Sequence, residues 1–196
     1  MALPDGLVHH ERPNAILGWA STGVVVLGSV ESLLTNAILW GGFALFIAAV
    51  VAVPAFSTGE WTVIVPWPLP LFAAVAVLVR SVGVYPEIAG YVAIATLALV
   101  VVVELDAFTS VEMSRRFAVG FAVLTTMAIQ GLWTVAQFYS DMWLGTKLLR
   151  SQTELQWDFV IVTAVGLVEG GIFERYFERF SPAGAAEQSV DARGSS

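Results

Sequence analysis

Residues 130–180 read QGLWTVAQFYSDMWLGTKLLRSQTELQWDFVIVTAVGLVEGGIFERYFERF. Two apolar segments flank a polar loop in this stretch, and each apolar segment contains polar side chains. Gln130 and Gln137 lie seven residues apart, which places them on one face of an α-helix. Asp158 and Glu169 lie eleven residues apart, about three helical turns, and again share a face. The stretch therefore predicts two helices that bring polar groups into an apolar setting.

The composition predicts an all-α integral membrane protein. Of the 196 residues, 57% are hydrophobic and 13% are charged, whereas soluble domains have roughly 25% charged residues. The mean hydropathy is +0.78, and the apolar residues form long blocks, as membrane-spanning helices require. The chain contains no cysteine, which excludes disulfides, thiol nucleophiles and thiolate metal sites. The net charge of -7 argues against nucleic-acid binding and is typical of proteins from high-salt organisms.

The apolar blocks predict a bundle of about six transmembrane helices. Residues 16–56 would form a helix about twice the thickness of the hydrocarbon core, so they must fold into two spans. We expect a polar leader over 1–14, the membrane domain over 15–180 and a disordered tail over 181–196. The predicted spans are 15–32, 36–56, 69–81, 88–103, 117–138 and 157–177.

The segment before the third span should not be helical. Pro66, Pro68 and Pro70 cannot all lie inside a helix, because each removes a hydrogen-bond donor and clashes with the preceding turn. We expect residues 61–67 to be interfacial or partly extended. At the start of the last span, Ser151 and Glu154 form a capping-box pattern.

The distribution of basic residues predicts a plasma-membrane protein with cytoplasmic termini. Six spans place both termini on one side of the bilayer. In this orientation the inside segments contain six arginines and the outside segments contain three basic residues, in line with the positive-inside rule.

Two stripes of polar residues are the candidate ligand or ion site. Short connections make consecutive helices neighbours, so we expect the two stripes to face each other. The loop 139–156 is too apolar for a free linker, and we expect Asp141 and residues 143–145 to fold back onto the bundle. The candidate residues are Gln130, Trp133 and Gln137 on the fifth span, Asp141 in the loop, and Asp158 and Glu169 on the sixth, where Glu154 lies on the same face.

Glu169 is the strongest single signal. It lies about 18 Å along the helix from Trp157 and therefore near the middle of the membrane, where a charge is costly unless it is paired or protonated. We expect a protonated side chain that faces the fifth helix and bonds to Gln130, Thr134 or Thr163. A polar pocket or ion path and a purely structural contact between helices are both compatible with this position.

Other motifs are weak. Gly166 and Gly170 have the GxxxG spacing, which allows a neighbouring helix to approach within the protomer or in a homo-oligomer. No phosphate loop, GxSxG elbow or HExxH motif is present, and the histidines at positions 9 and 10 lie in the leader. The sequence therefore indicates no cofactor and no metal site.

The stretch AQFYSDMWLGTKLLRSQTELQWDF, residues 136–159, resembles the YjdF-like family of small multi-span membrane proteins, with closing helices similar to those of VanZ-like proteins. Residues 32–40, SLLTNAILW, are similar to the first hairpin of that family. Where such proteins usually have a glutamate-rich helix, this chain has Gln130 and Gln137. The family has no assigned activity, so the resemblance implies a topology rather than a reaction. The matching positions are Asp141, Gly145, Thr146 and Asp158.

Three functions remain open on the sequence. The first is a membrane protein with a polar, acidic pocket between the last two helices that binds or passes a small ligand, proton or ion. The second is an accessory subunit of a larger membrane complex. The third is an enzyme acting on lipid-linked substrates through Asp141, Asp158 and Glu169, which would require these carboxylates to line one cavity.

Overall fold

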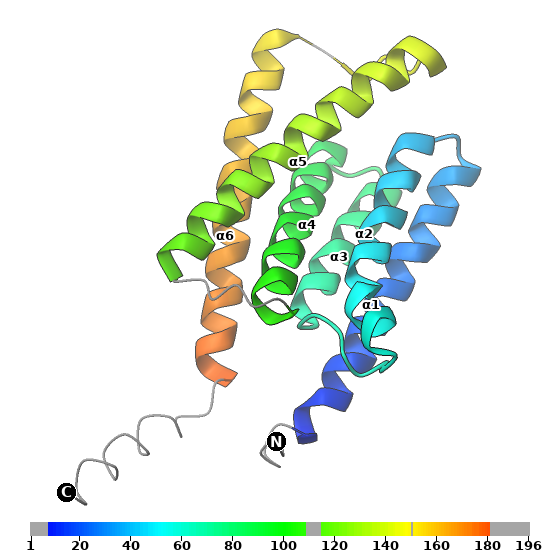
Figure 1. Ribbon diagram of the computed structural model, residues 1–196. Coiled ribbons are helices and arrows are strands. Elements are labelled where there is room, and N and C mark those ends of the chain that lie inside the picture. Colours follow the sequence, from blue (N-terminus) through cyan, green and yellow to red (C-terminus); the bar gives the residue numbers. More distant parts are fainter. Residues whose placement is uncertain (1–7, 109–114, 150, 181–196) are drawn as a thin grey trace, which may run out of the picture.

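The computed structural model describes residues 8–108, 115–149 and 151–180, and within these residues the chain is helical with no strand (Figure 1). This confirms the predicted all-helical fold. The helices are α1 (Val8–Leu34), α2 (Ile38–Thr58), α3 (Pro68–Ser81), α4 (Pro86–Phe108), α5 (Arg115–Leu144) and α6 (Gln152–Phe180).

Five helices of the described chain are long and apolar enough to cross a bilayer. The exception is α3, whose 14 residues span about 21 Å, less than the roughly 30 Å of the hydrocarbon core. The five long spans are Arg12–Leu34, Ile38–Thr58, Pro86–Asp106, Phe117–Leu144 and Gln152–Ile172.

Two helix boundaries differ from the predicted ones. α1 begins at Val8, inside the predicted polar leader, and includes Pro13. α5 continues to Leu144 instead of ending at residue 138, because the chain has no helix breaker before Gly145. Gly145 has a φ of 68°, the left-handed conformation typical of a helix C-terminus. Residues 1–7 of the leader and the predicted tail 181–196 lie outside the described residues.

The helices form two groups that share α4 (Figure 1). On one side, α1 packs against α2 and α3, and α2 and α3 pack against α4. On the other side, α5 and α6 pack against each other and against α4. The helix α4 is consequently the most enclosed of the long spans. In its most apolar stretch of 18 residues, 56% of the residues are buried, against 11% in the corresponding stretches of α5 and α6.

The segment 61–67 is non-helical, as predicted, and its middle residues lie in the protein core, whereas Trp61 at its start is 54% exposed. Ile64 and Val65 are buried in the main hydrophobic cluster. Asn14 of α1 forms hydrogen bonds with two backbone groups of this segment. Its Oδ1 accepts from Trp67 N at 2.8 Å, and its Nδ2 donates to Val65 O at 3.5 Å. The Trp19 indole N–H donates to Trp61 O at 2.8 Å. These bonds replace the intrahelical partners that the segment lacks.

Small residues set the spacing of α1 from its neighbours. A Cβ at Gly28 would lie 2.0 Å from Val77 Cγ1 on α3, so the two helices could not keep their separation with any larger residue. A Cβ at Gly41 of α2 would lie 2.8 Å from Leu33 Cγ and 3.0 Å from Ser29 O. The Ser29 hydroxyl donates to Gly41 O at 2.7 Å. These contacts make the first three helices a tight unit.

The first residues of α1 and the last residues of α6 lie at the same end of the bundle (Figure 1). At the opposite end, here called the upper end, the α1–α2 turn, the α3–α4 turn and the α5–α6 connection come together. The Ser81 hydroxyl donates to Glu31 Oε2 at 2.6 Å and links the ends of α3 and α1 there.

Single cysteines at Ser57, Ser81 and Ser151 test the topology, because all three side chains are exposed and the chain has no native cysteine. With cytoplasmic termini, a membrane-impermeant maleimide added to intact cells should label positions 81 and 151. Position 57 should react only after permeabilisation. The opposite pattern contradicts the orientation, and equal labelling at all three contradicts an even number of passages.

Gly28→Ala should destabilise the protein by about 1–3 kcal/mol, because the new methyl group overpacks the α1–α3 contact. Thermal unfolding in a non-ionic detergent measures the effect. Gly23→Ala is the matched control, since a Cβ at Gly23 meets none of the described atoms within 4 Å. Adding Val77→Ala to Gly28→Ala should restore most of the stability. A Gly28→Ala protein as stable as the wild type contradicts the close approach.

Candidate functional site

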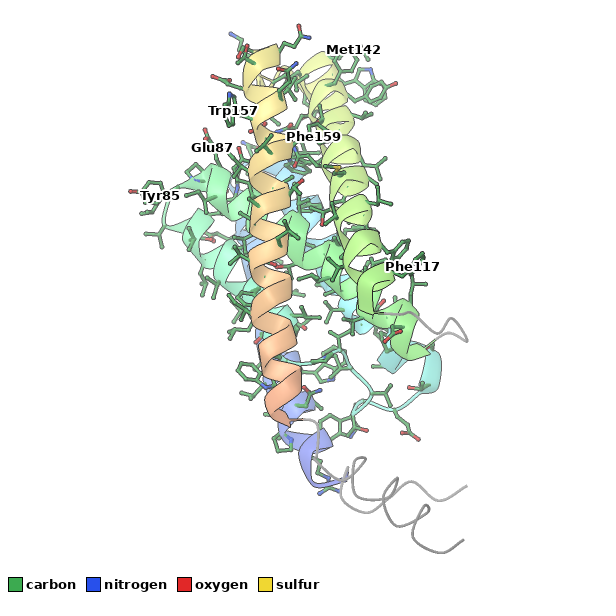
Figure 2. All side chains as sticks on the ribbon, turned by 90° about the vertical axis from the view of Figure 1, so that its left-hand side faces the viewer. Tyr85, Glu87, Phe117, Met142, Trp157 and Phe159 are labelled. Atoms are coloured by element: carbon green, nitrogen blue, oxygen red, sulfur yellow. The ribbon has the colours of Figure 1, made fainter. Side chains whose placement is uncertain are left out.

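A cavity of about 640 Å³ lies at the upper end of the bundle. Its lining comes from α2, α3, α4, α5, α6 and the connection between α5 and α6, so it is broader than a pocket between the last two helices. At this end, α5 and α6 extend well above the level of Glu87, which lies at the start of α4 (Figure 2). Polar and charged side chains in the lining are Asn36, Arg80, Glu87, Tyr91, Gln130, Gln137, Thr146, Ser151, Thr153, Glu154 and Asp158.

The predicted polar–aromatic stripe of α5 lines this cavity in full. Gln130, Trp133 and Gln137 follow one another at spacings of three and four residues, and all three are lining residues. Gln130 is 2% exposed, and its Oε1 has no hydrogen-bond partner among the described residues. A buried acceptor without a partner is rare in proteins, so its presence in a cavity wall is notable.

Aromatic rings of α2 and α5 pack together beside the cavity. Trp133 packs against Phe43 with ring centroids 4.8 Å apart and against Trp40 at 6.1 Å. The guanidinium of Arg80 lies over the Trp40 ring, 4.4 Å from its centroid, and Nη1 donates to Pro86 O at 3.4 Å. Trp40 is 3% exposed, and its Nε1 lacks a partner within the described chain. We call Trp40, Phe43 and Trp133 the aromatic wall.

The charges of the described lining residues are mostly negative. Three carboxylates, Glu87, Glu154 and Asp158, face one guanidinium, Arg80. The Tyr91 hydroxyl donates to Asp158 Oδ1, which fixes the Asp158 side chain at the cavity wall.

The capping box that begins α6 is confirmed and contributes one of these carboxylates. Ser151 N donates to Glu154 Oε2, and Glu154 N donates to Ser151 Oγ, each at 3.3 Å. Ser151 and Glu154 both line the cavity, so the start of α6 is also part of its rim.

Glu169 lies elsewhere, buried between α6 and α4. It is 4% exposed, and its Oε2 accepts a hydrogen bond from Thr96 Oγ1 of α4 at 3.0 Å. It is not among the residues that line the cavity. The predicted partner on α5 or within α6 was wrong: Thr134 donates to Gln130 O, and Thr163 donates to Phe159 O. That Glu169 is protonated stays a prediction.

The glycines near Glu169 explain why its partner is on α4. A Cβ at Gly166 would lie 3.4 Å from Thr126 Oγ1 of α5 and 3.6 Å from Ala95 Cβ of α4, and one at Gly170 would lie 3.8 Å from Leu99 Cδ2 of α4. The GxxxG spacing therefore serves contacts of α6 with α4 and α5 within the protomer. Because Glu169 lies one residue before Gly170, the contact with α4 brings it to Thr96. Association of two copies through these glycines stays a prediction.

Asp141 organises the connection between α5 and α6. Its Oδ1 accepts from Thr146 Oγ1 and from Leu148 N, both at 2.6 Å, and its Oδ2 accepts from Leu149 N at 2.8 Å. Residues 146, 148 and 149 consequently fold back and line the cavity, whereas Asp141 itself does not. The expected fold-back occurs after Gly145; residues 143 and 144 remain on α5 and are exposed.

The structure thus brings four of the six ligand or ion candidates into one cavity and leaves two outside it. Gln130, Trp133, Gln137 and Asp158 line the cavity, and Asp141 and Glu169 do not. Sequence reasoning missed Trp40, Arg80 and Tyr91. A signal for Arg80 was present, because it is the only basic residue between positions 13 and 114.

No group of three or more His, Cys, Asp or Glu side chains within the described ranges could hold a metal ion.

Long apolar helices with a polar cavity at one end define a multi-pass helical membrane protein. Residues 4–64 match the family model DUF8268, a domain of unknown function. The match covers about a third of the chain and, among the described residues, includes α1, α2 and the first part of the 61–67 segment. No curated protein and no solved structure matches the chain.

The Glu169–Thr96 contact can be tested by substitution. Glu169→Gln should keep the stability of the protein, because the amide oxygen can accept the Thr96 hydrogen bond. Glu169→Leu should lower the free energy of unfolding by about 1–3 kcal/mol, since the buried Thr96 hydroxyl loses its acceptor. Thermal unfolding in detergent is the measurement. Adding Thr96→Val should recover most of the loss in Glu169→Leu; equal stability of the Gln and Leu variants contradicts the contact.

Proposed function

We propose that this protein binds a small polar ligand with a cationic group in the cavity at the upper end of the bundle. The observation behind the proposal is the lining: three carboxylates and one guanidinium surround a space of about 640 Å³ among the described residues. With cytoplasmic termini in the plasma membrane, this cavity faces the outside of the cell.

Two buried polar groups support a ligand. Gln130 Oε1 is an acceptor and Trp40 Nε1 is a donor, and both lack partners in the part of the chain that the structure describes. Both residues line the cavity. Both atoms are closed off from the empty cavity, so a ligand with a donor and an acceptor reaches them when the Gln130 and Trp40 side chains turn toward it; it would then compensate two groups whose burial costs about 1–3 kcal/mol each.

The sign of the ligand charge follows from the carboxylates and the indoles. Glu154 and Asp158 lie four residues apart on one face of α6, so both carboxylates border the same part of the cavity. Trp40, Trp133 and Trp157 are also lining residues. Indole faces attract cations, as the guanidinium over Trp40 illustrates. An ammonium group therefore fits this site better than a free anion.

The three carboxylates that the enzyme hypothesis requires do not line one cavity. It required Asp141, Asp158 and Glu169 at one cavity, and Asp158 alone of these three is a lining residue. The oxygens of Asp141 are bound by the connection between α5 and α6, and Glu169 bonds to Thr96. A role as an accessory subunit is supported by the exposed faces of α5 and α6, and it would not need the cavity. Membership of a YjdF-like family remains a proposal that rests on sequence motifs.

Ligand binding can be followed by tryptophan fluorescence and thermal stability of the purified protein in a maltoside detergent. Tetramethylammonium and phosphoethanolamine should change the fluorescence and raise the unfolding temperature, whereas acetate and sulfate should not. Asp158→Asn should weaken binding at least about tenfold, or ~1.4 kcal/mol. Equal responses to cations and anions, or an unaffected Asp158→Asn protein, contradict the proposal.

Matched glycine variants separate a blocked cavity from a misfolded protein. A Cβ at Gly90 meets nothing within 4 Å among the described residues, and Gly90 lines the cavity, so Gly90→Leu should fill it without a clash and abolish binding. Gly23→Leu on α1 is the control, because Gly23 has the same open surroundings and does not line this cavity. Unfolding temperatures without ligand should be similar for the two variants.

A further inference from the structure

We propose that the ligand is a membrane lipid whose zwitterionic head group, an ammonium joined to a phosphate diester, occupies the cavity while one acyl chain occupies an apolar groove between α2 and α5. This inference rests on the proposed function and specifies its ligand class. The observation behind it is that the cavity and the groove lie next to each other at the aromatic wall.

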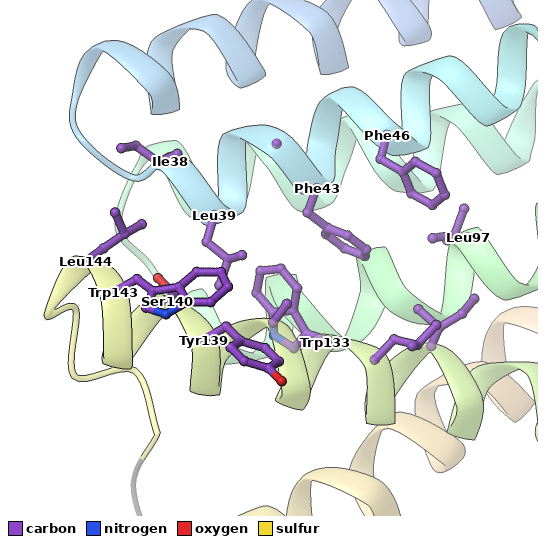
Figure 3. Close-up of a pocket in the computed structure, with 14 residues that line it drawn as sticks. Ile38, Leu39, Phe43, Phe46, Leu97, Trp133, Tyr139, Ser140, Trp143 and Leu144 are labelled. Carbon is purple, nitrogen blue, oxygen red and sulfur yellow. The ribbon is translucent and has the colours of Figure 1, made fainter.

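The groove has about 600 Å³ of space and is almost entirely apolar (Figure 3). Leu39, Phe43 and Phe46 of α2 form one side, and Trp133, Tyr139 and Trp143 of α5 form the other (Figure 3). Hydrocarbon is the only abundant partner in a bilayer for a concave surface of this composition.

The groove and the cavity are adjacent. Ile38, Leu39 and Trp133 line both of them. Trp40 lines the cavity alone and Phe43 lines the groove alone, and their rings lie 5.9 Å apart. An amphiphile could therefore pass around the edge of the aromatic wall at Ile38 and Leu39, with its polar part on one side and its chain on the other.

The dimensions of the groove match one leaflet. From Ile38 to Phe46 the groove follows eight residues of α2, about 12 Å at 1.5 Å per residue. One leaflet of the hydrocarbon core is roughly 15 Å thick. The groove starts at the upper end, next to the cavity, and descends toward the middle of the membrane, which is the direction that an acyl chain takes below its head group.

The groove is also accessible from the bilayer. Phe46 is 56% exposed and Leu132 is 69% exposed, although both line it. A lipid could enter sideways from the leaflet without leaving the membrane. A soluble cation does not need an opening toward the lipid. The groove therefore favours a lipid over a free ion as the occupant of the whole site.

The charges of the cavity suit both parts of a zwitterionic head group. Glu154 and Asp158 can accept hydrogen bonds from an ammonium. The guanidinium of Arg80 has five N–H donors, of which one contact to Pro86 O is observed, so others are geometrically able to meet a phosphate. An anionic lipid would lack a partner for the carboxylates and should bind more weakly.

The experiment compares lipid binding with head-group binding in three glycine variants. Native mass spectrometry in a maltoside detergent measures the affinity for phosphatidylethanolamine and for phosphatidylglycerol with the same chains. Tryptophan fluorescence measures the affinity for phosphoethanolamine, which has no chain. Gly42 lines the groove, and a Cβ there meets none of the described atoms within 4 Å, so Gly42→Leu should fill the groove without a clash.

We expect the wild type to bind phosphatidylethanolamine at least tenfold more tightly than either phosphatidylglycerol or phosphoethanolamine. Gly42→Leu should weaken lipid binding at least tenfold and leave phosphoethanolamine binding unchanged. Gly90→Leu should abolish both, and Gly23→Leu should change neither.

Unchanged lipid affinity in Gly42→Leu, or equal affinity for the two lipids, overturns the lipid inference while leaving the proposed function intact. Failure of the wild type to bind phosphoethanolamine and tetramethylammonium overturns the proposed function itself.

Discussion

The hydrogen bonds between Asn14 and the backbone of residues 65 and 67 hold the segment that leads into α3 against α1. Buried backbone groups outside a helix need partners from elsewhere in the protein. One amide side chain on α1 does this for Trp67 N and Val65 O, and the Trp19 indole does so for Trp61 O. With these groups satisfied, Ile64 and Val65 can lie in the core, and the chain can reach α3 without a full-length helix.

The cavity lies where helices of unequal length end. α3 has only 14 residues, whereas α5 has 30 and α6 has 29. The α5–α6 pair rises above the start of α4 (Figure 2). Arg80 at the end of α3 and Glu87 at the start of α4 line the space left between them. Close contacts at Gly28 and Gly41 keep the first three helices from spreading into it.

The sequence was sufficient for features that depend on local chemistry. Long apolar blocks predicted the helices, three prolines predicted the non-helical segment, and Ser151 with Glu154 predicted a cap that the structure contains. The contacts between residues of different helices were harder to predict from the sequence. The helix α4 is apolar around its whole circumference, so no periodicity indicated that Tyr91 would face Asp158 or that Thr96 would face Glu169. Asp141 was predicted as a site residue, but it lies outside the cavity because its oxygens bind the backbone of Leu148 and Leu149. Residue spacing does not reveal this loop geometry.

The position of Trp133 on α5 connects the two halves of the candidate site. Gln130 and Gln137 line the cavity, and Leu132 and Ala136, one residue to the side of this stripe, line the groove. Trp133 lies at the boundary and lines both. Since adjacent stripes of one helix cannot rotate independently, any motion of α5 that widens the groove must also move Gln130 and Gln137 relative to the carboxylates of α6. The chain site and the head-group site are thus mechanically a single site, which is the physical reason to expect one amphiphile rather than two unrelated ligands.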